Sequence, residues 1–199
     1  MCGRFFWDND AEEAFEEDFP ELAGMARLQE KVLRTADYTP AMEAAAVVGA
    51  AGALAADILK WGFIGFDKGR LLINARAESV RTKQTFAESF AARRCVLPAA
   101  GFYEWDKKKE KVIFRSPDRP ILYLAGIYRP YGDEKRFVIL TREANASMLP
   151  VHDRMPLILT REEVEPWVCD AGRAASALMK ELPLLKAERP NEQLTFDWT

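Results

Sequence analysis

The feature that most limits the fold is a succession of short strand-like runs in the second half of the chain, each ended by a turn or a charged cluster. This spacing is typical of antiparallel sheets, because a hairpin reverses direction within a few residues. The runs are residues 94–98, 101–105, 112–115, 121–128, 136–141 and 156–159. The lysine-rich segment 106–111 between two of them favours a solvent-exposed hairpin tip over a DNA contact.

Other patterns complete the predicted architecture. Residues 45–48 and 54–63 flank a Gly/Ala turn and predict a hairpin, and residues 70–75 predict a buried strand. Helical patterns cover 10–18, 85–93 and 171–182, and capping boxes start at Thr85 and Thr160. We predict an α+β fold whose mostly antiparallel sheet is strongly curved or forms an open barrel, with helices flanking it.

Length and composition indicate the number of domains and the expected cellular compartment. The chain has 199 residues, 49% of them hydrophobic, which suffices for one core, and we predict a single domain over 1–199. The longest uncharged run, 44–56, is too short to span a membrane, and the N-terminus lacks a signal-peptide pattern. We expect a soluble cytoplasmic monomer with no membrane partner.

Charge and cysteine usage narrow the function classes. A net charge of -3 argues mildly against nucleic acid, although a local basic groove can occur on an acidic protein. The three cysteines, Cys2, Cys95 and Cys169, have no CxxC spacing, and the chain has one histidine. We therefore predict neither a disulfide framework nor a metal or other cofactor.

Cys2 directly follows the initiator methionine. Removal of Met1 would place an α-amine and a thiol on one residue, with ordinary pKa values of about 8 and about 8.5. Such a 1,2-aminothiol condenses with an aldehyde to an imine, and the thiol then closes a five-membered thiazolidine ring. An incidental buried cysteine is the plainer interpretation of this residue alone.

Two further side chains suit proton transfer. His152, in V-H-D-R-M-P, precedes a strand-like run, and histidine is the side chain whose unperturbed pKa lies nearest neutrality. Glu104, in G-F-Y-E-W, shares a strand face with Phe102, and apolar surroundings would raise its pKa. Each also has an ordinary structural interpretation, as a hydrogen-bonded histidine and a solvent-facing glutamate.

A third group of residues suits positioning and phosphate binding. Asn74, in I-N-A-R-A-E, is a poor strand former and could orient a nucleophile by hydrogen bonds, while Arg76 on the same face could hold a phosphate. Single-stranded nucleic acid needs cations interleaved with aromatic platforms. The candidates near these motifs are Arg4, Arg81, Arg93, Arg94 and Arg154, with Trp7, Trp61, Phe63, Tyr103 and Trp105. We expect at least half of these aromatic residues to lie in the core.

Taken together, these segments resemble one family. The order and spacing of six motifs resemble those of the SRAP family, whose members capture abasic sites in DNA. The motifs are M-C-G-R-F, K-W-G-F, I-N-A-R-A-E-S, R-R-C-V-L-P-A-A-G-F-Y-E-W, L-A-G-I-Y and V-H-D-R-M-P-L-I-L. The segments cover residues 1 to about 168 and the combination is highly specific. The chain resembles the short bacterial version.

The resemblance implies roles for matching residues. Cys2 matches the nucleophile, Asn74 the residue that positions its amine and the sugar, Glu104 the acid that assists ring opening, and His152 the acid/base on the imine. Arg4 and Arg76 match phosphate-binding arginines, and we extend the DNA contacts to Trp61, Trp105 and Arg154. The implied partner is single-stranded DNA with an abasic site, and the implied product is a covalent thiazolidine crosslink, with strand scission by β-elimination as a secondary outcome.

Two segments depart from the family pattern. Residues 37–42 read D-Y-T-P-A-M, with Ala41 and Met42 in place of a polar residue after the proline, so a pocket role for that loop is open. The end of the chain, 183–199, lacks the pattern of longer members. The competing hypothesis is a cysteine peptidase or amidohydrolase in which Cys2 attacks an external amide with His152 as base. A non-catalytic interaction domain is a third hypothesis.

Overall fold

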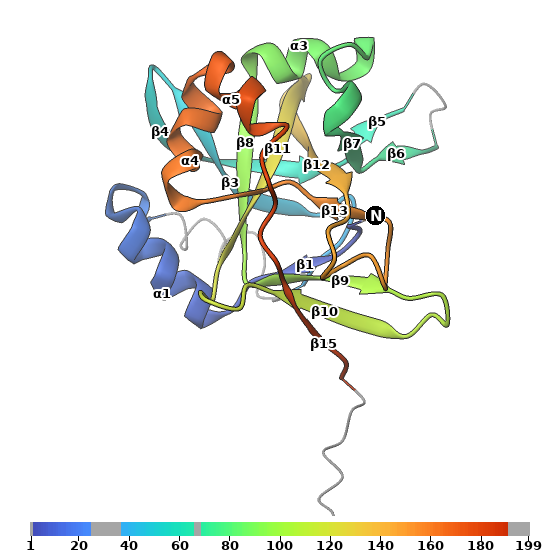
Figure 1. The fold of residues 1–199 in the computed structure, drawn as a ribbon. Coiled ribbons are helices and arrows are strands. Elements are labelled where there is room, and N and C mark those ends of the chain that lie inside the picture. The colour runs from blue at the N-terminus through green and yellow to red at the C-terminus, as the bar shows by residue number, and fades with distance from the viewer. Residues whose placement is uncertain (1, 25–36, 66–68, 191–199) are drawn as a thin grey trace, which may run out of the picture.

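A closed ring of five strands forms the centre of the molecule. The computed structural model describes residues 2–24, 37–65 and 69–190 (Figure 1). Each strand of this ring pairs with the next, and the parallel pairing of β12 with β4 closes it. In spatial order the members are β4 (Ala53–Trp61), β3 (Glu43–Ala50), β8 (Arg94–Ala99), β11 (Leu122–Tyr131) and β12 (Glu134–Glu143). The predicted α+β fold with a curved, barrel-like and mostly antiparallel sheet is therefore confirmed.

Shorter strands extend the ring. β7 (Asn74–Arg76) runs parallel to β12, β13 (Arg154–Pro156) runs antiparallel to it, and β14 (Ile158–Leu159) pairs with β11. Both β7 and β13 pair with the C-terminal half of β12, where Thr141 is opposite Arg76 and Pro156. The ring thus brings two of the predicted motifs to one strand.

A second sheet continues from the ring, because the chain passes directly from β8 into β9. Its order is β15 (Lys186–Glu188), β10 (Lys111–Arg115), β9 (Gly101–Trp105), β1 (Phe5–Phe6) and β2 (Asp37–Tyr38). Phe5 is opposite Phe102, so the first residues of the chain lie beside the strand that carries Glu104. A separate two-stranded sheet pairs β5 (Phe63–Ile64) with β6 (Leu71–Leu72).

Helices cover the outside of the sheets (Figure 1). They are α1 (Asn9–Asp18), α3 (Gln84–Ala92), α4 (Arg161–Cys169) and α5 (Ala171–Ala177), with short 3-10 turns η1 (Pro20–Leu22) and η2 (Ala77–Ser79). The capping box predicted at Thr160 with Glu163 is present at the start of α4. The box predicted at Thr85 is wrong, because α3 already begins at Gln84 and Lys83 is its N-cap.

Arg94 links the helices to the ring. Its guanidinium is buried and donates to the carbonyl oxygens of Phe90 at 2.8 Å, Ala91 at 2.7 Å and Trp167 at 2.6 Å. A cation is favourable there because helix C-termini expose unpaired carbonyls and the negative end of the helix dipole. The prediction of Arg94 as a DNA-facing cation is therefore wrong. Among the described residues, no helix has the length and apolarity needed to cross a membrane.

Candidate active site

Cys2 is completely buried at the junction between the two sheets. The backbone N–H of Arg4 points to its sulfur, and the carboxylate of Glu104 is near enough to act on it electrostatically. Burial first, and the negative charge of Glu104 second, raise the pKa of the Cys2 thiol far above its ordinary value. The thiol is consequently neutral at physiological pH. Met1 lies outside the described residues.

Asn74 holds the backbone of Cys2. Its side-chain Nδ2 donates to the Cys2 carbonyl oxygen at 2.9 Å, across 72 residues of sequence. Its Oδ1 is buried and accepts no hydrogen bond from any other described residue. An amide whose donor is engaged and whose acceptor is unused can receive one more N–H or O–H. The short strand β7 places this amide, because its pairing with Ile139 of β12 fixes Asn74 at the edge of the ring.

Glu104 is buried on β9, with 4% of its surface exposed. Strand alternation places it on the same face as Phe102, which is fully buried, and opposite to Tyr103. The structure therefore brings Glu104 and Asn74 to Cys2 from two different sheets. A buried carboxylate beside a nucleophile is a suitable proton donor or acceptor.

His152 lies at the entry to β13, with 28% of its side chain exposed. Its Nδ1 accepts the backbone N–H of Arg154 at 2.9 Å and is also 2.9 Å from a carboxylate oxygen of Asp153. Nδ1 is therefore engaged by both neighbours, and these contacts fix the orientation of the imidazole ring at the entry to β13.

Arg154 anchors the strand that carries His152. Its guanidinium makes two 2.8 Å bonds to the Glu78 carboxylate and one 2.6 Å bond to the Thr141 carbonyl. The bond from Arg154 lowers the pKa of Glu78. These bonds hold the Arg154 guanidinium against its neighbours and away from solvent. The structure therefore gives no support to the prediction of Arg154 as a DNA contact. Arg76, in contrast, is exposed on β7.

Arg4 is half-buried and paired with Asp37 of β2. Its guanidinium lies 5.3 Å from the centre of the Tyr103 ring, and the Tyr103 N–H donates to its carbonyl at 2.9 Å. Because Tyr103 and Glu104 alternate along β9, Arg4 lies on the opposite face of the second sheet from the Glu104 carboxylate. The structure thus separates this predicted phosphate contact from the buried part of the site.

The two predicted tryptophan contacts differ in exposure. Trp61 is 1% exposed, its indole N–H donates to the Ile73 carbonyl at 2.9 Å, and its ring stacks on Phe137. Its prediction as a DNA platform is wrong, because a base cannot reach a ring enclosed in the core. Trp105 is 41% exposed at the end of β9 and is accessible to a base.

Sequence reasoning missed the partners that hold these residues. Glu78 and Asp37 fix Arg154 and Arg4, and both lie inside segments already singled out, N-A-R-A-E and D-Y-T-P-A-M. In the second segment the Met42 sulfur accepts the Thr39 N–H at 3.3 Å, so this loop forms a turn beside β1. Only the fold reveals these pairings, because the partners are distant in sequence.

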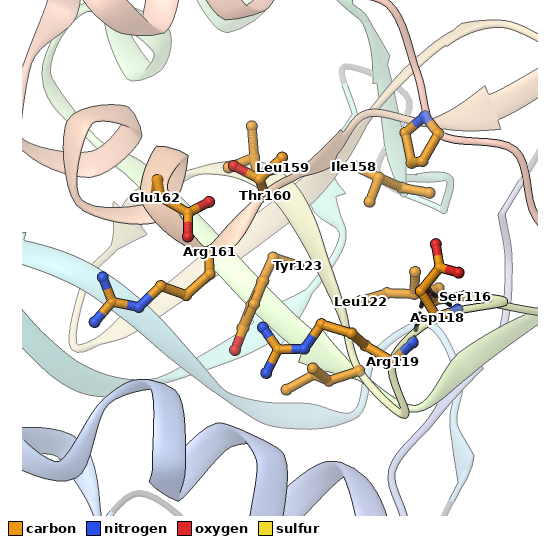
Figure 2. A pocket seen from close by; sticks show the side chains of 12 residues that line it. Ser116, Asp118, Arg119, Leu122, Tyr123, Ile158, Leu159, Thr160, Arg161 and Glu162 are labelled. Atoms are coloured by element: carbon orange, nitrogen blue, oxygen red, sulfur yellow. Dashed lines mark hydrogen bonds between the residues drawn. The ribbon is translucent and has the colours of Figure 1, made fainter.

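A separate cavity of about 310 Å³ lies between the chain before β11 and the start of α4 (Figure 2). Two of its polar side chains are already engaged, since Arg119 pairs with Asp18 at 2.9 Å and Tyr123 donates to the same carboxylate. None of the predicted site residues lines this cavity. Among the described residues, no group of three His, Cys, Asp or Glu side chains is placed to hold a metal ion.

The fold is a strand ring joined to a second sheet. A buried cysteine near the N-terminus is held by an amide and faced by a carboxylate. These features define an α+β protein with a thiol-containing site near the N-terminus. The family model described as SOS response associated peptidase (SRAP) matches residues 1–196. The chain belongs to this family, as its sequence motifs indicated.

Curated relatives carry the description abasic site processing protein. YoaM of Bacillus subtilis is 32% identical over 55% of this chain and 55% of its own length, and YedK of Escherichia coli is 33% identical over 61% and 60%. HMCES of Xenopus tropicalis is 28% identical over 62% of this chain and 43% of its own length. The chain therefore matches about half the length of these relatives.

Solved structures share the fold. A protein from Bacteroides thetaiotaomicron superimposes with a TM-score of 0.78 at 22% identity, covering 94% of this chain and 91% of its own. A phage-related protein from Bordetella bronchiseptica gives a TM-score of 0.76 at 23% identity, covering 96% and 95%. These likenesses concern architecture alone.

Proposed function

We propose that this chain processes abasic sites in DNA by capturing the sugar aldehyde on Cys2 as a thiazolidine. The observation that carries the proposal is the Asn74 amide, which binds the Cys2 carbonyl at 2.9 Å and keeps a buried, unused Oδ1. That oxygen suits the N–H of a free α-amine or of the imine formed from it. Family membership and the description of the curated relatives support the same substrate.

The first step is hydrolysis of the Met1–Cys2 peptide bond. Water is consumed, methionine leaves, and the α-amine of Cys2 becomes free. Glu104, buried beside Cys2, is the residue we assign to activating that water, with His152 as a second proton carrier. This assignment makes the chain a self-processing peptidase, in keeping with the family description.

Capture then proceeds without oxidation or reduction. The Cys2 amine adds to the aldehyde carbon of the ring-opened deoxyribose, and loss of water gives an imine. The Cys2 sulfur adds to the imine carbon, its proton passes to the nitrogen, and the five-membered ring closes. Glu104 supplies the proton that opens the furanose, and His152 exchanges protons with the imine. Elimination from the imine before ring closure gives lyase activity as a side reaction.

The neutral thiol distinguishes this chemistry from an external-amide peptidase. Reactive cysteine nucleophiles have lowered thiol pKa values, whereas burial and Glu104 raise the pKa of Cys2. Amine-first capture tolerates a neutral thiol, because the sulfur reacts only after the imine is formed. The observation therefore favours aldehyde capture over amide hydrolysis of foreign peptides.

The DNA contacts we assign are the exposed Arg76 and Trp105, with Arg4 on the outer face of the second sheet. We propose single-stranded DNA as the ligand, because an extruded sugar and stacked bases need an unpaired strand. A soluble monomer that is cytoplasmic and associates with the nucleoid when bound is the matching cellular form.

The test is covalent capture of an oligonucleotide with one abasic site by the full chain. We expect an adduct that survives SDS, with an intact mass equal to the chain without methionine plus the oligonucleotide minus one water. Cys2→Ala should lose this adduct yet form an imine that borohydride traps, and Cys169→Ala, at an exposed cysteine, should behave like the parent. A borohydride-independent adduct with Cys2→Ala, or Cys2-dependent cleavage of a peptide library without capture, would overturn the proposal.

A further inference from the structure

The hairpin of β9 and β10 concentrates positive charge on an acidic protein. Residues 105–115 contain five cationic side chains and two acidic ones, whereas the whole chain has a net charge of -3. The hairpin extends beyond the body of the molecule (Figure 1). A local cationic element on an otherwise acidic protein is a candidate electrostatic contact for a polyanion.

The two acidic side chains of the hairpin share one cation from elsewhere in the protein. Arg189 binds the Asp106 carboxylate at 2.9 Å and the Glu110 carboxylate at 3.2 Å. The other Asp106 oxygen accepts the N–H groups of Lys108 at 2.8 Å and Glu110 at 3.0 Å, which fixes the turn. Across the described part of the chain, lysines 107–109 make no ion pair, so their charge is available to a ligand.

The outer face of the hairpin joins cations to aromatic rings. The Lys111 ammonium lies 3.8 Å from the centre of the Tyr103 ring, and the Arg115 guanidinium lies 4.6 Å from that of Phe6. Lys111 is directly opposite the exposed Trp105 in the strand register. An accessible ring beside a held cation is the pairing that single strands use, with bases on the ring and phosphates on the cation.

The hairpin starts at the site described above. Glu104 lies on β9, which ends at Trp105, and the turn that carries lysines 107–109 follows directly, roughly 10 Å from Glu104 at the rise of an extended strand. A strand that leaves the site along the hairpin would meet the lysines a few phosphates from the captured sugar.

We propose that this hairpin binds the DNA strand flanking the captured nucleotide, with Trp105 stacking on a base and lysines 107–109 on successive phosphates. The inference rests on the proposed function and adds the flanking strand as a ligand. The sequence alone favours a merely solvated tip. The structure adds two observations that favour a DNA contact, namely the ion pairs of Arg189 with the acidic residues of the hairpin and the position of Lys111 opposite Trp105.

The test measures equilibrium binding of the full chain to a single strand carrying a tetrahydrofuran analogue, which has no aldehyde and cannot be captured. Probes of about 20 and about 3 nucleotides, the shorter with the analogue at its centre, are compared because a single neighbouring nucleotide does not span the roughly 10 Å to the lysines. The variant is K107Q/K108Q/K109Q. The matched control is A171E/R173E, which changes the net charge equally at exposed positions of α5, a helix that packs on α3 and α4.

We expect the triple variant to bind the longer probe about tenfold more weakly, with a salt slope reduced by about 2, because each lost phosphate contact removes about 0.7 from a single-strand slope. Binding of the short probe and covalent capture of a short abasic strand should stay at the parental level. Parental affinity and slope in the triple variant, or an equal loss in the control, would overturn the hairpin proposal. Failure of capture in the parent would instead overturn the proposed function and leave the binding result interpretable.

Discussion

At the scale of single residues, the site depends on one amide that is well placed and incompletely used. Asn74 was singled out from sequence because asparagine is a poor strand former, and the structure shows it bonded to the Cys2 backbone. The sequence could not have shown the bonding partner, since 72 residues separate the two. Glu104 was weighed as a solvent-facing residue or a buried acid, and the buried alternative is correct.

Asn74→Ala should slow capture of an abasic strand by about a hundredfold, because loss of the amide lets the Cys2 backbone shift. Its free energy of unfolding should fall by about 1 kcal/mol, the value of one hydrogen bond. Rates of SDS-stable adduct formation and urea denaturation measure the two effects.

Asn145→Ala is the matched control, since that amide also donates to backbone carbonyls, at 2.8 Å to Pro183 and 3.2 Å to Leu182. It should lose more stability than Asn74→Ala, because its Oδ1 also accepts the Ser147 N–H at 3.1 Å and O–H at 2.6 Å, and yet capture at the parental rate. Equal slowing in both variants would show that Asn74 acts only through the fold.

At the scale of elements, patterns within one element were predicted better than contacts between elements. The capping box of α4 is local and was correct. Residues 70–75 were predicted as one strand but form β6 and β7, separated at Ile73, whose carbonyl accepts the N–H of Ile139 and the indole N–H of Trp61. These competing bonds come from distant strands. The burial of Trp61 could not be predicted for the same reason, because a short motif does not show which distant strands cover a side chain.

The Glu78–Arg154 pair fixes β13 to η2, and its effect should depend on pH. The pKa of Glu78 is lowered in the folded state, so its contribution to stability is present above the unfolded value of about 4.3 and is lost as the pH falls through the folded value. Because Glu78 is 40% exposed, we expect Glu78→Gln to cost about 0.2–1 kcal/mol at pH 7, and this difference to disappear in acid. Urea denaturation across pH measures it.

Capture should also slow by roughly tenfold in Glu78→Gln, because His152 lies two residues before Arg154, which the pair holds. Asp57→Asn, which loses its 2.6 Å ion pair with Lys135, is the control and should capture normally. Parental capture by Glu78→Gln would mean that β13 keeps His152 in place without the pair.

At the scale of the whole molecule, closure of the strand ring determines what can be packed inside. The curved sheet was predicted from the density of short strands, but the parallel pairing of β12 with β4 was not, because hairpin signals specify only neighbouring antiparallel strands. Inside the ring, Gly126 leaves no room for a side chain. An added Cβ would lie 2.9 Å from the Cys95 sulfur and 3.0 Å from the Val138 carbonyl.

Gly126→Ala should therefore destabilise the protein by about 1–3 kcal/mol through overpacking. Gly69→Ala, with nothing within 4 Å of the added carbon, should stay within about 0.5 kcal/mol of the parent. Midpoints of urea unfolding compare them. A parental midpoint for Gly126→Ala would contradict the close approach of β8, β11 and β12.

The long sequence separation between Cys2 and its supporting residues affects the order of events during synthesis. The ribosome makes the cysteine before the asparagine, glutamate and histidine, and a chain emerges at only about 5–20 residues per second. A nascent chain therefore carries its sulfur for several seconds before the groups that bury and position it exist. During that interval the thiol keeps its ordinary pKa and is open to solvent, and it is enclosed only when the finished polypeptide has closed around it.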